Sequence, residues 1–412
     1  MFGGPMTSSG NSSLSTAADV RLLYAARGLR GFGDGFAVII LPAYLSAIGY
    51  SPLQIGIVAT AALLGSAVLT LAVGFFAPRH DLRNLLLAGA ALVALTGLAF
   101  PVSGHIAVVL AVAFFGTINP STGDSGVLVP LEHAMLARGV ADRERTAAFA
   151  RYSLIGALAG AAGSLAAATP DALALAGIAQ VTAFKLMFLL YAVLGLASAA
   201  LYRRLPHVEM RETASTPLGP SRGTVYKLAA LFSLDSFAGG LAVQSMLALW
   251  LFERFELSLS GASLFFFWSS TLGAFSFPVA AWLSRRIGLI NTMVFTHIPS
   301  SIFLIAAAFS PYLTLTLALL LLRSALSQMD VPTRTSYVMA VVTPPERTAA
   351  ASVTAVPRSL ASSISPALAG ALLGTSFAGL PLVACGVLKI VYDLALLYAF
   401  RHVKPPEERA GQ

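Results

Sequence analysis

Long apolar segments separated by short polar ones fill almost the whole of the 412-residue chain. A membrane-spanning helix needs about 20 apolar residues, and segments of this length satisfy their own backbone in lipid as helices rather than as barrel strands. The pattern predicts an all-α membrane protein with twelve spans. Their expected ranges are 19–47, 52–77, 83–102, 105–136, 146–169, 175–202, 226–252, 259–284, 289–309, 312–342, 348–375 and 378–400.

The composition excludes a water-soluble globule. Hydrophobic residues make up 57% of the chain and charged residues only 11%, against about 25% charged residues in soluble domains. Cys385 is the single cysteine, so no intrachain disulfide and no thiolate metal cage is expected. Nucleotide-binding loops and hydrolase or metalloprotease motifs are absent from the sequence, which indicates neither a cofactor nor an enzyme.

The chain contains an internal repeat. The pentapeptide at 144–148 (ERTAA) returns at 346–350, an offset of 346 minus 144, or 202 residues. A Val-Pro pair precedes each copy at the same offset, and residues 32–38 align with residues 237–243 at an offset of 205. Duplication in so apolar a chain is typical of carriers that alternate between two faces of a membrane.

A polar interruption at residues 203–227 lies where the repeat predicts a boundary. The predicted organisation is a tail (1–18), an N-terminal half (19–203), a linker (204–225), a C-terminal half (226–404) and a second tail (405–412). The other loops are too short to hold a soluble catalytic domain.

The net charge of +8 follows the topology, because the basic residues gather on alternate loops. This positive-inside pattern places both termini in the cytoplasm, and a bacterial-type inner membrane is expected. The charge therefore does not indicate a nucleic-acid partner.

The loop between the second and third predicted spans carries a family signature. Gly74, Arg79 and Arg83 match the basic loop motif of the major facilitator superfamily, while Pro78 and Asp81 replace the Asp and second Gly of that motif. Arg145 and Arg347, in the two repeated pentapeptides, are similar to the family's junction between spans four and five.

The resemblance covers essentially the whole chain. It implies two pseudo-symmetric six-helix bundles, secondary transport at a site between them, and a cytoplasmic gate formed by these loops.

Ionisable groups within the bilayer are candidate functional residues, because each costs about 2.5–3.5 kcal/mol at mid-membrane on insertion scales. Asp34 lies midway along the first span among glycines, and a desolvated carboxyl group suits proton binding and release. The alternative is a permanent pair with Arg30, one helical turn away.

Asp124 lies in a polar run, residues 119–126, inside the fourth span. Contact with a proton or substrate is one interpretation, since a broken helix at that depth must line protein or water. A packing kink from Pro120 is the other. Glu132 and His133 are assigned to a gate or an interface.

Spans ten to twelve contribute further candidates. Asp330 and Arg334 are four residues apart and can neutralise each other, as can Lys389 and Asp393. The deep arginines Arg323 and Arg358 have two open interpretations. They bind a carboxylate or phosphate of the substrate, or they pair between helices with Asp235 or Asp393.

Asp235 aligns with Arg30 under the repeat, so an ion pair between the two halves is a hypothesis for a gate. Gln244 and Trp268 complete the candidate substrate or gate residues. The aromatic run that contains Trp268 covers all sides of a helical turn, so lipid contact or core packing is the main expectation for it.

These features predict a secondary active transporter of a small organic solute. Proton-coupled export of an amphipathic compound by antiport is slightly favoured. Uptake of an organic anion, coupled to protons or sodium, is the close alternative, and a non-transporting membrane scaffold is a third. The expected partners are the solute, protons or sodium, and the lipid bilayer, and a monomer suffices.

Overall fold

The computed structural model describes residues 17–76, 80–102, 104–121, 126–140, 142–208 and 217–403, and within these ranges the chain is helical. The first half contains α1 (Ala17–Ala47), α2 (Pro52–Phe76), α3 (Leu82–Ala99), α4 (Ile106–Phe115), α5 (Leu128–Gly139), α6 (Asp142–Ala166), α7 (Thr169–Leu175) and α8 (Gln180–Tyr202). The second half contains α9 (Arg222–Gly240), α10 (Gln244–Phe255), α11 (Leu259–Ile287), α12 (Leu289–Phe309), α13 (Leu313–Ser327), α14 (Asp330–Val341), α15 (Arg347–Leu373) and α16 (Leu380–Phe400).

Three of the predicted spans are broken into two helices each. The fourth consists of α4 and α5, the seventh of α9 and α10, and the tenth of α13 and α14. Joining these pairs gives twelve spans among the described residues, six in each half. Breaks at membrane depth are tolerated where the freed backbone lines protein or a cavity, so they indicate the functional interior.

Two boundaries differ from the sequence prediction. The sixth span begins at Gln180 rather than at residue 175, because Thr169–Leu175 forms a separate helix with a proline in its first turn. The seventh span begins at Arg222, within the predicted linker. Otherwise the predicted spans and the helices agree to within a few residues, apart from the breaks.

The two halves use the same helix contact. A Cβ atom added at Gly35 of α1 would lie 2.1 Å from the carbonyl oxygen of Gly160 in α6. At the repeat-equivalent Gly240 of α9 it would lie 2.6 Å from the carbonyl oxygen of Ser362 in α15. Small residues permit close approach of membrane helices, so the repeat extends to the packing of span one on five and of span seven on eleven.

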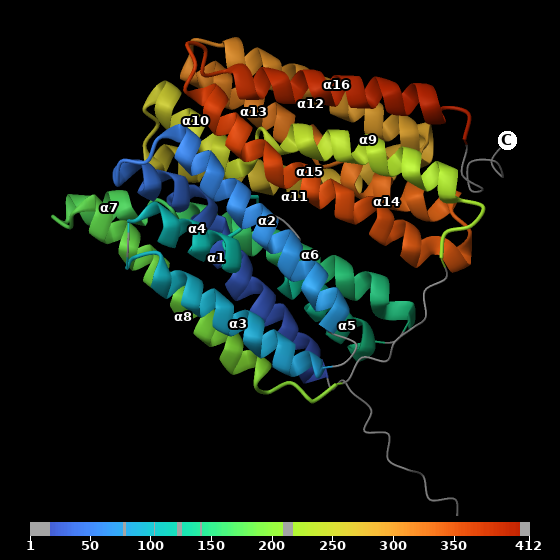
Figure 1. Cartoon of the computed structure of the whole chain (residues 1–412), viewed down its shortest axis with the longest axis horizontal. Helices are drawn as coiled ribbons and strands as arrows, with labels where there is room; N and C mark the ends of the chain where they lie inside the picture. Colours follow the sequence, from blue (N-terminus) through green and yellow to red (C-terminus); the bar gives the residue numbers. More distant parts are fainter. Residues whose placement is uncertain are drawn as a thin grey trace, which may run out of the picture.

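The halves meet at one end of the molecule. The first turns of α2 pack on the last turns of α15, where the Thr60 hydroxyl accepts a hydrogen bond from the Ala367 amide at 3.0 Å. At the same end, Asp171 accepts hydrogen bonds from the amide and hydroxyl of Ser260 at 2.9 and 2.8 Å. Toward the end where α5 and α14 lie, the two sets of helices spread apart (Figure 1).

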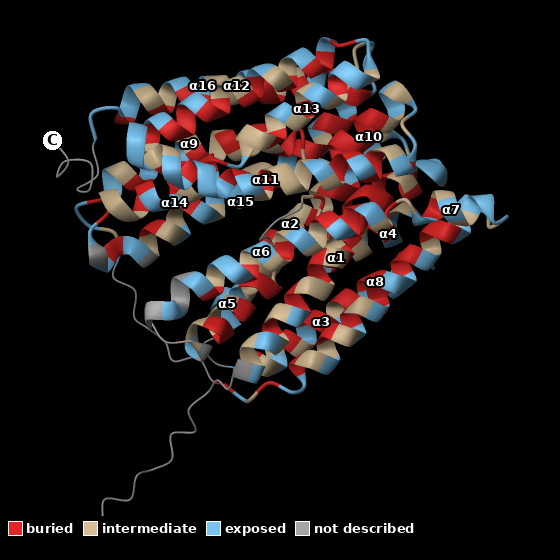
Figure 2. Cartoon of the chain, turned by 180° about the vertical axis from the view of Figure 1, so that it is seen from behind, coloured by how far each residue is buried: buried red, intermediate tan, exposed pale blue. Residues whose placement is uncertain are grey.

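Buried residues follow this arrangement. In Figure 2 they gather between helices within each half and at the joined end, whereas the outer helix faces are mixed. Many large apolar residues on those outer faces are exposed, Phe275 and Tyr398 among them. In a chain with spanning helices the bilayer is the natural environment for such faces.

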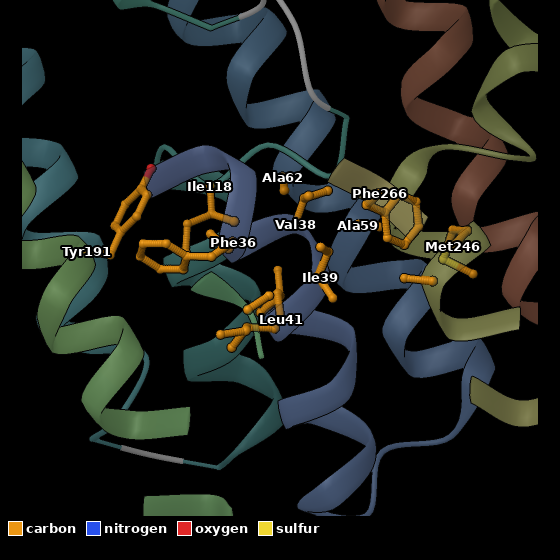
Figure 3. Close-up of a cluster of buried hydrophobic side chains, with 14 of the residues drawn as sticks. Phe36, Val38, Ile39, Leu41, Ala59, Ala62, Ile118, Tyr191, Met246 and Phe266 are labelled. Carbon is orange, nitrogen blue, oxygen red and sulfur yellow. The ribbon is translucent and has the colours of Figure 1, made fainter. Parts of the chain in front are cut away.

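Buried apolar side chains from both halves belong to one cluster, part of which is drawn in Figure 3. Phe36 and Ile39 of α1, Ala62 of α2, Met246 of α10 and Phe266 of α11 are each at most 2% exposed. We call these five residues the apolar seal. Its residues come from both halves. Its α1 residues come after Asp34 in the helix, on the side of the joined end.

Candidate functional site

A buried charge network occupies the first half. Glu132 of α5 is fully buried, and its carboxylate binds the guanidinium group of Arg30 and the hydroxyl groups of Tyr152 and Tyr202. Arg30 also donates to the Tyr152 oxygen at 2.9 Å. Arg27 lies 5.1 Å over the Tyr152 ring. The assignment of Glu132 to a gate or an interface stays a prediction, and in this structure its carboxylate joins α1, α6 and α8 to α5 within the N-terminal half.

Asp34 lies one turn from this network but outside it. Its described hydrogen bond comes from the Tyr191 hydroxyl at 3.1 Å, and that oxygen also lies 3.2 Å from the Thr117 hydroxyl. Because Arg30 pairs with Glu132, the structure does not contain the alternative Arg30–Asp34 ion pair. The first-span acid is thus held by a neutral phenol.

A pocket opens beside Asp34. It is open to solvent, and its empty space amounts to about 370 Å³ only when the solvent at the mouth is included. It is lined by both sides of the break in the fourth span and by α1, α2 and α8, through Arg30, Asp34, Ser66, Leu69, Gly116, Thr117, Gly126, Val127, Leu128 and Tyr191. A titratable carboxyl group, a phenol and a guanidinium group therefore share one cavity in the first half.

A second charge network occupies the C-terminal half. Asp235 of α9 binds Lys389 of α16 at 2.7 Å and Arg334 of α14 at 2.9 Å. Arg334 also pairs with Asp330, as the spacing of four predicted. The predicted Lys389–Asp393 pair is wrong, because Lys389 reaches Asp235 on another helix and Asp393 binds His297 at 3.0 Å.

The two networks are related by the repeat with their charges exchanged. Arg30 and Asp235 are equivalent at an offset of 205, and Glu132 and Arg334 at an offset of 202. In the first half the cation, Arg30, lies on the first span and the acid on the fourth. In the second half the acid, Asp235, lies on the seventh span and the cation, Arg334, on the tenth. The predicted gate pair between Arg30 and Asp235 is not present, because each side chain is engaged in its own half.

The deep arginines of the second half have no ionic partner in the part of the chain that the structure describes. Asp235 and Asp393 are both engaged elsewhere, and the guanidinium groups of Arg323 and Arg358 form no hydrogen bond or ion pair with any described residue. This removes the interhelical pairs that were one interpretation of these residues. Arg323 is half-buried and Arg358 is exposed.

Arg358 lies on α15, the helix that packs against both α2 of the other half and α9 of its own half. Ser362 and Pro366, four and eight residues further on, lie on the same helix face. The first contacts α9, and the carbonyl oxygen of the second would lie 2.3 Å from a Cβ atom added at Gly56 of α2. Arg358 is nearer than these two residues to the start of α15, at the end where the halves separate. Its charge lies near those of Asp235 and Arg334.

The remaining candidates in the bilayer are distributed around this centre. Gln244 begins α10 at the break in the seventh span, next to Ser245, whose amide donates to the Pro120 carbonyl oxygen at 3.0 Å. The breaks in spans four and seven thus touch across the halves. Trp268 of α11 is 49% exposed and packs edge-on to Phe267. Asp124 lies outside the described residues.

The signature loop is held by Asp81, which stands where the family motif has a glycine. Asp81 caps α3 by accepting from the Asn84 amide at 3.2 Å and binds the Val208 amide at 2.9 Å. Arg83 contacts His207 at 2.9 Å, and Gly74 is exposed near the end of α2. Arg79 lies outside the described residues.

The second gate block is tied to its own half. Arg347 donates to the carbonyl oxygen of Met339 at 3.1 Å, and the preceding Glu346 accepts from the Gly219 amide and the Thr343 hydroxyl. These contacts join the start of α9 to the turn between α14 and α15. Arg145 lies in α6, and its side chain is outside the described set.

Several site residues were missed in the sequence. Tyr152, Tyr191 and Tyr202 each bind a buried acid, and His297 bridges two charged residues of α16. The repeat could have found the Glu132–Arg334 equivalence, because each follows its Val-Pro pair by the same two residues. No local pattern marks the tyrosines, whose role depends on helix packing.

Twelve spans in two repeated halves, three of them broken around a central site, define the fold of a secondary transporter. The family model of the Major Facilitator Superfamily matches residues 23–321, and the chain belongs to this family.

Similar proteins support the same fold over nearly the full length. An uncharacterised membrane protein of Saccharomyces cerevisiae, YJR124C, is 25% identical, with 93% of this chain and 94% of that protein covered. A bacterial homologue of the human lysosomal transporter Spinster, in an inward-facing unoccupied conformation, matches with a TM-score of 0.70, 15% identity and coverage of 93% and 97%. The nucleoside transporter NupG matches with a TM-score of 0.71, 14% identity and coverage of 93% and 99%.

Proposed function

We propose that the chain carries a small organic anion across the membrane by alternating access, coupled to protons. The observation that carries this proposal is that Arg358 has no partner among the described residues. A mid-span arginine costs several kcal/mol in lipid, so its exposure fits a water-filled opening between the halves. The acids that could neutralise it, Asp235 and Asp393, are engaged with other residues.

An anion is the ligand that this chemistry favours. A guanidinium group offers a planar fork that binds a carboxylate or phosphate through two hydrogen bonds. Arg323 adds a second unpaired cation in the same half. We propose that both take part in binding, with Gln244 at the contact between the halves.

We propose Asp34 as a coupling acid. It lies in a pocket, is bound by a phenol and is free of an ion pair with Arg30. A carboxyl group in such a place can change its protonation without breaking the Arg30–Glu132 network. The positive-inside pattern places the termini in the cytoplasm, so the separated end of the halves would face the cytoplasm in this conformation.

Liposomes that contain the purified full-length protein and an internal pH-sensitive dye test the proposal. External pools of monocarboxylates, dicarboxylates, organic phosphates or lipophilic cations are added to wild type, Arg358→Gln and Asp34→Asn. One anion pool is expected to drive acidification of the interior. Arg358→Gln should abolish that signal, and Asp34→Asn should reduce the protons moved per anion.

Glu253→Gln is the matched control, since Glu253 is an exposed acid at the end of α10, and it should behave as wild type. If protons move in the direction opposite to a lipophilic cation, the function is export by antiport and the anion proposal is contradicted. The half-exposed Trp268 is the observation that favours this second candidate. Anion movement that needs sodium and leaves the dye unchanged would replace the proton as coupling ion. Inactivity of folded protein with every pool would favour the scaffold.

A further inference from the structure

Six titratable side chains form one continuous chain of contacts inside the C-terminal half. They come from four helices, and each side chain is at most 13% exposed. In order along the contacts they are Asp330, Arg334, Asp235, Lys389, His297 and Asp393. The proposed function uses Asp34 in the other half and leaves this chain without a role.

The contacts define where protons lie at the end of the chain. The Lys389 ammonium group can only donate, and it lies 3.2 Å from His297 Nε2, which makes that nitrogen the acceptor. Nδ1 then carries the hydrogen and donates to the two oxygens of Asp393 at 3.0 and 3.1 Å. The imidazole therefore connects a cation on one side to a carboxyl group on the other.

The chain contains one carboxyl group more than its cations can balance. Within the chain of contacts, the three carboxyl groups of Asp235, Asp330 and Asp393 are accompanied by two cations, Lys389 and Arg334, when His297 is neutral. Asp393 is fully buried, and its carboxyl group bonds to the imidazole alone among the described residues. A buried carboxylate without a cationic partner takes up a proton instead.

Other groups face this pair from the neighbouring helices. Arg323 of α13 interacts electrostatically with His297, and Cys385 and Tyr392 of α16 lie beside the same cluster. Arg358 of α15 acts on the Asp235 end of the chain. The charge of Arg323 opposes protonation of His297, and an anion bound to Arg323 would cancel that opposition.

We propose that His297 and Asp393 share one exchangeable proton, and that this proton is bound together with the anion. The linkage to transport rests on the proposed function, whereas the shared proton itself does not. Since binding free energies are reciprocal, an anion at Arg323 and Arg358 strengthens proton binding, and the proton strengthens anion binding by the same factor. This coupling favours movement of proton and anion in the same direction.

The pair is connected to α9 through Lys389. Lys389 is the most exposed member of the chain at 13%, and its ammonium nitrogen would lie 3.7 Å from a Cβ atom at Gly239 of α9. Gly239 is the repeat equivalent of Asp34 at the offset of 205. The second half thus has a lysine-linked imidazole near the position where the first half has its pocket acid.

The shared proton is tested on full-length protein in detergent without any substrate. Infrared difference spectra are recorded across a pH titration for wild type, Asp393→Asn, His297→Gln and Asp34→Asn. Wild type is expected to show a protonated-carboxyl band that Asp393→Asn loses, with about one proton fewer bound per protein. His297→Gln should shift the pH at which the band appears, and Asp34→Asn should retain it.

Transport then tests the coupling. With the anion pool that moves protons in liposomes, Asp393→Asn should move about half as many protons per anion as wild type, if Asp34 carries the other proton. A band unchanged in folded Asp393→Asn would overturn the shared proton. If wild type shows the carboxyl band but Asp393→Asn moves as many protons per anion as wild type, the proton would not be coupled to transport. If Asp393→Asn loses the band but wild type transports no anion, the proton site would be supported and the proposed function contradicted.

Discussion

Glu132 and Asp235 are buried carboxylates whose oxygens are fully engaged by cations and hydroxyl groups. Glu132 binds one guanidinium group and two phenols, and Asp235 binds an ammonium and a guanidinium group. Removing one partner from such a pair costs about 3–5 kcal/mol, because the other charge stays buried. These residues therefore stabilise helix packing within each half, and the proposed roles in coupling and binding belong to Asp34 and Arg358.

Glu346, in the turn before α15, provides a residue-scale prediction outside the bilayer. Hydrogen bonds from Ser221, Thr343 and the Gly219 amide lower the pKa of its carboxyl group to about 2. A lowered folded-state pKa contributes stability above the unfolded pKa, near 4.3, and this contribution is lost as pH falls toward the folded value. Glu346→Gln should therefore lower the melting temperature in detergent at neutral pH.

The pH dependence distinguishes this cause from a packing defect. The difference between wild type and Glu346→Gln should narrow as the pH falls below about 4. Glu253→Gln, a neutralisation at an exposed acid, should melt as wild type throughout. A gap that stays constant or widens in acid would show that the charge of Glu346 is not what stabilises this turn.

At the scale of elements, the pseudo-symmetry resides in helix contacts as much as in sequence. Gly35 on Gly160 and Gly240 on Ser362 place span one on five and span seven on eleven at the same depth. These contacts set the rotation of α1 and α9 about their axes, and therefore the directions in which the side chains of Arg30 and Asp235 point. The broken spans then bring Glu132 and Arg334, at equivalent positions of α5 and α14, to those side chains.

Gly35→Ala tests the contact between α1 and α6. Its Cβ atom would lie 2.1 Å from a backbone carbonyl oxygen, so the helices must move apart. Overpacking of this kind costs about 1–3 kcal/mol, and the melting temperature of the protein in detergent should fall. Gly28→Ala is the control, since its nearest atom, Ile155 Cγ2, would lie at an ordinary 3.7 Å. Equal melting temperatures for the two variants would contradict the close contact.

For the whole molecule, closure at one end and separation at the other decide which residues meet water. The apolar seal and the contact between α2 and α15 close the first end, and Arg358 lies beyond them toward the separated end.

Cysteine labelling tests this closure. In a Cys385→Ala background, Arg358→Cys should react rapidly with a membrane-impermeant thiol reagent applied from the side of the termini. Ala62→Cys is the matched control, because Ala62 is 2% exposed within the apolar seal and should stay unlabelled. Rapid labelling of both positions, or of Arg358→Cys from the opposite side only, would contradict the conformation described.

The twelve spans, the duplication and the class of protein can be predicted from the residues alone, because spans depend on local hydropathy and a repeat is visible in the order of the residues. The sequence also placed Asp34, Asp235, Arg323 and Arg358 within the bilayer. The partners of these charges were decided only by tertiary structure. Lys389 has Asp393 four residues away on its own helix, yet it binds Asp235, 154 residues distant. Ion pairs between helices depend on which faces pack together, and that information is absent from spacing along one helix.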